Sequence, residues 1–140
     1  MSALVTVRRR ITAPVGELFD AWLDPVSLAA WMRPRGISRS EAEVDARTGG
    51  AFRIVMTDAH HAIVHTGIYH EIDRPRRLAF SWRSPATDDR ESLVIVDFTP
   101  DGDGTIVEIR HDRLPHDEAR RSHTDGWTDV LSTLDTHVTI

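Results

Sequence analysis

Histidine is the residue type in this chain with the widest chemical range, because an imidazole can donate or accept a proton near neutral pH. Eight histidines occur among the 140 residues. His111 ends a predicted strand whose inward face carries Val107 and Ile109, and His123 lies on the apolar side of a predicted C-terminal helix. These two side chains are the best candidates for polar contacts to a ligand or for a general acid–base pair. A purely structural role is the alternative.

A second group of histidines is dense enough to be weighed as a metal site. His60 and His61 fall in a predicted turn, whereas His65 and His70 fall on opposite faces of the next strand by parity. The chain has no cysteine that could add a thiolate ligand. The run 101–104 (DGDG) lacks the glutamate that a calcium loop needs further on, so a hairpin turn explains it better. We expect no metal and no cofactor.

Other motifs of catalysis are missing from the sequence. No lysine is present, which excludes Schiff-base chemistry. No serine or threonine has the context of a nucleophile elbow, and Gly49-Gly50 is not followed by the helix that a phosphate loop requires. Catalysis therefore has no positive signal, and we interpret the chain as a binding protein rather than an enzyme.

Large apolar side chains supply another kind of candidate site. Four tryptophans and four phenylalanines fall mainly on faces predicted to point inward. Filling a core is the ordinary role of such residues, and lining a cavity is the functional alternative. The best cavity candidates are those predicted to converge on the final helix: Trp31, Met56, Trp82, Phe98, Trp127 and Leu131.

The first elements that position these side chains follow from apolar spacing and capping signals. Residues 4–11 are rich in β-branched side chains and predict a strand. Residues 14–23 and 25–32 carry apolar side chains at helical spacing and predict two short helices. Asp24 followed by Pro25 is typical of an N-cap and a first helical residue, so the two helices should meet at this point.

The remaining elements predict a sheet and one long helix. From residue 38 to residue 111 the apolar period is two, which predicts six strands joined by short turns and hence antiparallel pairing. Residues 116–138 repeat apolar side chains every three or four positions, which predicts a helix long enough to cover one sheet face. Gly126 inside this helix either lets a strand approach closely or permits a bend that opens a pocket. We predict one α+β domain over residues 1–140.

Charge and hydropathy limit the partners and the compartment. The net charge is −5, with acidic and basic residues interspersed, so no basic face is available for nucleic acid. No segment approaches the roughly 20 apolar residues that cross a bilayer, and the N-terminus lacks a secretory signal pattern. We expect a cytoplasmic protein without membrane insertion. Apolar residues assigned to the outer sheet face (Ile63, Leu93 and Ile95) make a homodimer plausible.

Short motifs occur in a fixed order along nearly the whole chain. They are Ala13-Pro14, Phe19-Asp20-Ala21-Trp22, Asp24-Pro25, Trp31, Pro34, Gly49-Gly50-Ala51-Phe52-Arg53, Gly67, Tyr69, Glu71-Ile72, Arg77-Leu78, Phe80, Trp82, Gly104-Thr105, His123 and Gly126-Trp127. Each is weak alone, but their joint occurrence is specific. The chain resembles the START-like superfamily, also called SRPBCC or helix-grip, and within it the branch related to the activator of the heat-shock-protein-90 (Hsp90) ATPase.

The resemblance implies a seven-stranded antiparallel curved sheet wrapped around the long C-terminal helix, with two short helices after strand one and a cavity between sheet and helix. It implies less about activity, because bacterial single-domain members look alike in fold while lacking a shared catalytic set. The Hsp90 relation comes from a branch in which this domain is joined to a separate N-terminal domain, which we do not expect here. A direct action on the chaperone is therefore only an analogy by fold.

Three classes of function stay open, and one is preferred. We expect a small apolar or amphipathic molecule to bind in an internal cavity, with His111 and His123 orienting its polar group. A stress-related or chaperone-associated interaction protein is the second class, and a cyclase- or hydratase-type enzyme with a histidine base is the third. The residues expected to bind the ligand are Trp31, Met56, Trp82, Phe98, His111, His123, Trp127 and Leu131.

Overall fold

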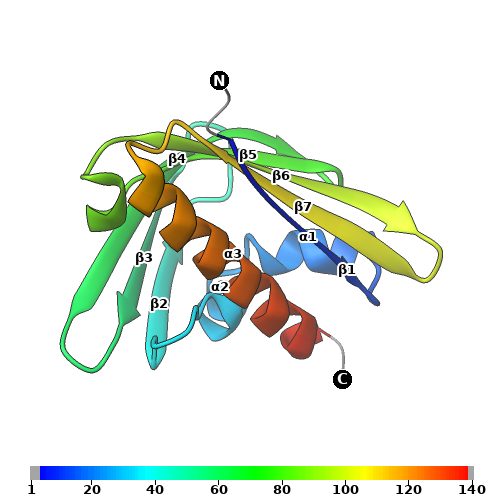
Figure 1. Ribbon diagram of the computed structural model, residues 1–140. Helices are drawn as coiled ribbons and strands as arrows, with labels where there is room; N and C mark the ends of the chain where they lie inside the picture. Colours follow the sequence, from blue (N-terminus) through cyan, green and yellow to red (C-terminus); the bar gives the residue numbers. More distant parts are fainter. Residues whose placement is uncertain (1–3, 139–140) are drawn as a thin grey trace.

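The computed structural model describes residues 4–138 (Figure 1). The elements in chain order are β1 (Val5–Ile11), α1 (Val15–Ala21), α2 (Pro25–Trp31), β2 (Arg39–Val44), β3 (Ala51–Thr57), β4 (Ala62–Asp73), β5 (Arg77–Trp82), η1 (Pro85–Thr87), β6 (Ser92–Asp101), β7 (Gly104–Asp112) and α3 (Asp117–Val138). The predicted order of strands and helices is confirmed. The 3₁₀ helix η1 lies in the connection between β5 and β6, where no helix was predicted.

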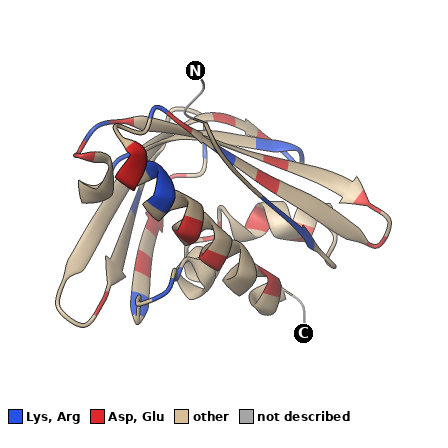
Figure 2. Cartoon of the chain, viewed as in Figure 1, with Lys and Arg blue, Asp and Glu red and all other residues tan. Residues whose placement is uncertain are grey.

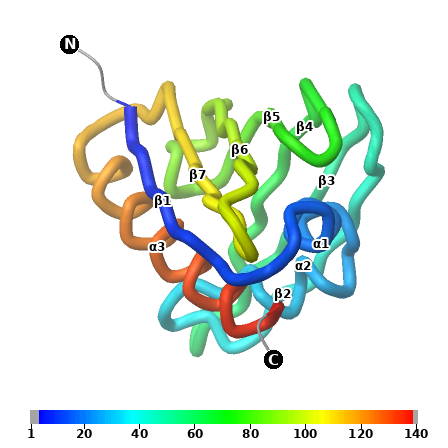
Figure 3. The backbone as a smooth tube through the Cα atoms, turned by 90° about the vertical axis from the view of Figure 1, so that its right-hand side faces the viewer, coloured from blue at the N-terminus to red at the C-terminus, as the bar shows by residue number. Residues whose placement is uncertain are grey.

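The seven strands form one antiparallel sheet in the order β1-β7-β6-β5-β4-β3-β2. β1 and β2 are consecutive strands, yet they lie at opposite edges because α1 and α2 carry the chain from one edge to the other. The sheet curls over α3, which crosses its concave side (Figures 1 and 3). The predicted α+β helix-grip architecture is confirmed.

The C-terminal half of α3 is fastened to its neighbours by polar contacts. Arg9 of β1 forms an ion pair with Asp135 at 2.8 Å. The Thr133 hydroxyl donates to the Trp31 carbonyl at the end of α2, and Ser27 Oγ lies 2.9 Å from His137 Nε2. The apolar side of the helix is buried along its length, as its 3.6-residue period predicts. These contacts hold α3 against α2 and β1 at this end.

The poor alternation of β4 has a structural cause. Its inward face carries Ile63, His65 and Tyr69, and the register with β5 shifts between Tyr69 and Glu71. Such a bulge inserts one residue and reverses the parity of everything after it, which lets Ile72 pack against the same core. The assignment of Ile63 to the outer face is therefore wrong: this side chain faces inward.

Two local features determine where α2 begins and how closely β4 approaches β5. The Asp24 carboxylate accepts a hydrogen bond from the Ser27 backbone amide at 3.2 Å, which confirms the predicted N-cap of α2. In β4, a Cβ atom at Gly67 would lie 1.9 Å from the Ser81 carbonyl oxygen and 2.5 Å from the Phe52 ring. Only glycine therefore lets β4 approach β5 this closely.

Among residues 4–138, no helix is both long and apolar enough to span a membrane.

Candidate functional site

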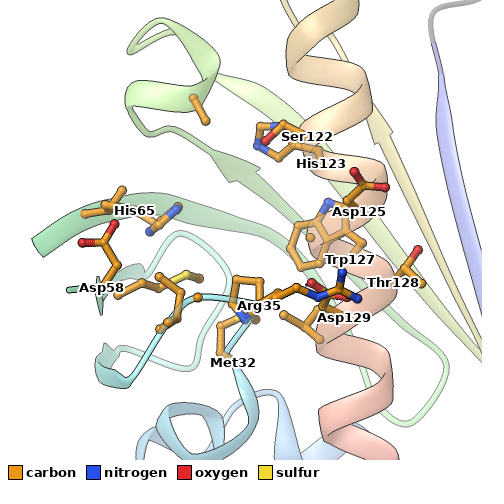
Figure 4. A pocket seen from close by; sticks show the side chains of 18 of the residues that line it. Met32, Arg35, Asp58, His65, Ser122, His123, Asp125, Trp127, Thr128 and Asp129 are labelled. Carbon is orange, nitrogen blue, oxygen red and sulfur yellow. The ribbon is translucent and has the colours of Figure 1, made fainter. Parts of the chain in front are cut away.

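A cleft of about 710 Å³ lies between the N-terminal half of α3 and the β3–β4 hairpin. The loop that joins α2 to β2 borders it from below, and η1 borders it from above (Figure 4). Its apolar wall is formed by Met32, Ile37, Met56, Ile63, Trp82, Trp127 and Val130. Its volume falls within the range of small-molecule sites, which is roughly 300–1,000 Å³.

Two histidines face this cleft from opposite walls. His65 comes from β4 and His123 from α3, and their rings point toward the space between the two elements (Figure 4). Burial lowers the pKa of His65 to about 4 and also lowers the pKa of His123. His123 Nδ1 donates to the Ala119 carbonyl at 2.7 Å, so the Nε2 of the neutral ring is an acceptor. The middle of the cleft is therefore polar but uncharged at pH 7.

His111 lies behind this wall and is fully buried. Its Nδ1 accepts from the Trp127 indole N–H at 2.9 Å, and its Nε2 lies 2.7 Å from Ser92 Oγ. Because the Ser92 hydroxyl donates to the Trp82 carbonyl at 2.6 Å, it must accept from His111 Nε2–H. Burial, followed by the proximity of His123, lowers the pKa of His111 to about 3. His111 is thus a neutral group that fixes the Trp127 indole in the cleft wall.

Charged residues are confined to the rim of the cleft. Asp58, Asp125 and Asp129 bring carboxylates to the opening, and Arg35 supplies one guanidinium. Backbone amides of His60 and His61 hold the pKa of Asp58 below its usual value. Figure 2 shows acidic residues recurring along α3 and no extended basic face around it. The rim therefore disfavours an anionic ligand.

The segment 33–38, which connects α2 to β2, is attached to α3 beside the cleft. The Arg35 backbone amide donates to the Asp129 carboxylate at 2.9 Å, while its guanidinium lies 3.7 Å from the same carboxylate. The turn is closed by a hydrogen bond from the Ile37 amide to the Pro34 carbonyl at 3.0 Å. This segment borders one side of the cleft (Figure 4).

Gly126 lies on the cleft side of α3. A Cβ atom at this position would meet no atom within 4 Å, so the explanation that glycine permits close approach of a strand is wrong. α3 is assigned as one helix from Asp117 to Val138 through this residue. The absence of a side chain at Gly126 leaves the cleft wider than any other residue would.

The structure divides the predicted ligand-binding residues into two groups. Met56, Trp82, His123 and Trp127 line the cleft. The other four lie in the core and do not line it: Trp31, Phe98, His111 and Leu131. Phe98 is covered by Phe19 of α1, Trp31 and Leu131 lie on the helices α2 and α3 themselves, and His111 lies behind Trp127.

Several residues of the cleft were not singled out from the sequence. His65 was weighed only as a metal ligand, although its parity with Ile63 on β4 places both side chains on one face. The segment 33–38, which also borders the cleft, carries no periodic signal at all. Within the described part of the chain, no three metal-ligating side chains come together.

Comparisons with known proteins place this geometry in a family. A sequence model described as "Activator of Hsp90 ATPase homolog 1-like protein" matches residues 12–139. The comparison with curated proteins finds no match. Protein CV1439 from Chromobacterium violaceum is similar in structure, with a TM-score of 0.88, 25% identity and 98% of each chain covered.

Two further solved structures share the fold. CalU16 from Micromonospora echinospora has a TM-score of 0.72 at 24% identity, over 99% of this chain and 85% of its own. PFC0360w, an HSP90 activator from Plasmodium falciparum, has a TM-score of 0.74 at 22% identity, over 95% of this chain and 94% of its own. The chain belongs to the family of activator of Hsp90 ATPase homolog 1-like proteins, within the START-like (SRPBCC, helix-grip) superfamily.

Proposed function

We propose that the protein binds a small apolar or amphipathic molecule in the cleft between α3 and the β3–β4 hairpin. The observation that carries the proposal is the composition of its wall. Tryptophan and methionine side chains meet two neutral histidines there, in a space of about 710 Å³. Apolar surface with a few convergent polar groups is the usual chemistry of a small-molecule site. Methionines Met32 and Met56 can adapt to ligands of different shape.

The arrangement supports binding more directly than catalysis. His111 has both ring nitrogens engaged by Trp127 and Ser92, so it is not free to act as a base. His123 offers one nitrogen to the cleft, and His65 lies across from it. No nucleophile stands beside them among the lining residues apart from the Ser122 and Thr128 hydroxyls. We infer that these groups orient a ligand.

A blocking variant tests the proposal. Gly126→Phe would place a ring into the open space of the cleft, whereas Thr136→Phe adds the same ring on an exposed position of α3. The neutral fluorophore N-phenyl-1-naphthylamine should bind the wild type and Thr136→Phe equally. We expect Gly126→Phe to weaken binding at least about tenfold, which corresponds to about 1.4 kcal/mol. Equal binding by Gly126→Phe would contradict the proposed site.

A second candidate function is that of a chaperone-associated protein. The family match over residues 12–139 favours it, because the family takes its description from an activator of the Hsp90 ATPase. Under this candidate the purified protein should raise the ATP turnover of an Hsp90 chaperone, measured with saturating ATP and a chaperone inhibitor as background control. Unchanged turnover over a range of protein concentrations would eliminate this candidate and leave the first one standing.

A further inference from the structure

The four tryptophans differ in the state of their indole N–H groups. Trp31 donates to the Ala21 carbonyl at 3.0 Å, and Trp127 donates to His111 at 2.9 Å. The Nε1 atoms of Trp22 and Trp82 are buried and have no hydrogen-bond partner among the described residues. An indole N–H can only donate. A buried donor without an acceptor is unfavourable enough that an unseen acceptor is the usual explanation.

The two tryptophans with unpartnered indole N–H groups border the same small space. A void of about 10 Å³ lies in the core and is lined by both Trp22 and Trp82. The two indoles also flank Trp127, with ring centroids 6.3 Å and 5.1 Å from it. A third unpartnered atom, Nδ1 of His65, belongs to a ring 5.0 Å from that of Trp82. Buried polar atoms without a partner therefore gather around the rings of Trp82 and Trp127.

Met32 and Trp82 line both the void and the cleft, so the void is separated from the cleft by a shared wall. Met32 has three rotatable bonds and a polarizable thioether, which makes it the most adaptable part of that wall. A rotation of its side chain would join the two spaces. The joined space would be an apolar channel whose inner wall includes the indoles of Trp22 and Trp82.

We propose that the ligand is an uncharged, largely apolar molecule whose buried end carries a carbonyl or ether oxygen, and that this oxygen accepts hydrogen bonds from the indole N–H groups of Trp22 and Trp82. The inference rests on the proposed function and specifies its ligand class. One oxygen can accept from two donors, because it has two lone pairs. A carboxylate is disfavoured at this end, since the surroundings are apolar and the nearby imidazole of His65 is neutral.

Three matched probes test the ligand class. The ketone 2-acetylnaphthalene and the hydrocarbon 2-isopropylnaphthalene have the same skeleton, and 2-naphthoate replaces the ketone by a carboxylate. We expect the wild type to bind the ketone about five- to tenfold more tightly than the hydrocarbon, the effect of one net hydrogen bond, and to bind the naphthoate most weakly. Dissociation constants come from isothermal titration calorimetry.

Single substitutions then locate the donors. Trp22→Phe and Trp82→Phe should each reduce the ratio of ketone to hydrocarbon affinity toward one. Trp31→Phe, which removes an N–H already paired with Ala21, should leave the ratio unchanged. The ratio is informative even where a variant has a slightly altered cleft, because both probes experience the same change.

A measurement on the wild type keeps the test valid if a variant fails to fold. In ¹H–¹⁵N spectra, the ketone should shift the indole N–H resonances of Trp22 and Trp82 downfield and move that of Trp31 little. Equal affinity for ketone and hydrocarbon, with unshifted resonances, would mean that a water molecule fills the void, and would overturn this inference alone. Failure of the wild type to bind any probe would overturn the proposed function as well.

Discussion

The concave side of the sheet has two ends that share the same apolar chemistry but are covered differently. At the end near α1, side chains such as Phe19, Trp31 and Leu134 are completely buried, and Phe19 packs edge-on against Phe98 at 5.2 Å. At the end near the β3–β4 hairpin, Trp82 and other inward side chains border an open cleft. The sheet is continuous between the two ends.

The cleft therefore forms where helices and loops leave the sheet uncovered, and the composition of the sheet face does not decide its position. At the filled end, three helices meet above the strands and close the core. At the open end, α3 has only η1 and the segment 33–38 beside it. The same aromatic side chain is thus a core residue at one end and a pocket wall at the other, depending on what packs over it.

Truncation of one aromatic residue at the filled end should have the largest effect on stability. We expect Phe98→Ala to lower the free energy of unfolding by about 3–5 kcal/mol, because it removes a buried ring and leaves a cavity. Met56→Ala at the open end should cost about 2 kcal/mol, the low end for such a change, since its side chain already borders the cleft. Urea denaturation measures both variants.

Only one of the two variants should change ligand binding. Met56→Ala should weaken binding of N-phenyl-1-naphthylamine, whereas a folded Phe98→Ala protein should keep the wild-type affinity. Equal losses of affinity would show that both ends of the concave side contribute to ligand binding, which would contradict the assignment of the site to the open end.

Removal of the buried link between β6 and α3 should have the next largest effect. His111 joins Ser92 on β6 to Trp127 on α3. His111→Leu would leave the Trp127 N–H and the Ser92 hydroxyl without this partner, at a cost of about 2–3 kcal/mol. His70→Leu changes an exposed position of β4 and serves as control. We also expect the near-ultraviolet circular dichroism of the tryptophans to change in His111→Leu alone.

Acidification should destabilise the protein through its buried histidines. The pKa values of His65 and His111 are lowered in the folded state to about 4 and about 3, so below pH 6.5 the unfolded chain binds more protons than the folded one. Their contribution is complete above the unfolded pKa and is lost as the pH falls toward the folded values. From pH 7.5 to 5.5 we expect a loss of about 1.4 kcal/mol for each histidine.

Urea denaturation of the wild type and of His65→Leu over this pH range separates the contributions. The slope of the free energy of unfolding against pH should correspond to about one bound proton fewer in His65→Leu than in the wild type. A variant with the wild-type slope would show that His65 is protonated in the folded protein, contrary to a neutral cleft.

The sequence predicted the architecture well because apolar period and capping residues are local signals. The N-cap at Asp24 and the apolar stripe of α3 can each be recognised from residues that lie three or four positions apart in the sequence. The cleft depends on which segments pack over which part of the sheet, and this is a long-range property. His65 was obscured by the β4 bulge, which disturbs the alternation on which parity depends. The partners of His111 lie on β6 and α3, and no spacing rule reveals them.

Substitution of Gly126 by alanine should have the smallest effect on stability, and it should separate stability from binding most clearly. A methyl group at this position meets open space, and alanine is favoured over glycine inside a helix by about 0.5–1 kcal/mol. We therefore expect Gly126→Ala to raise the free energy of unfolding by that amount while it narrows the cleft slightly. Thermal denaturation and a titration with N-phenyl-1-naphthylamine measure the two properties. A stabilised variant with weakened binding would show that the ligand uses the open space at Gly126. Destabilisation would show that α3 needs the conformational freedom of glycine at this point.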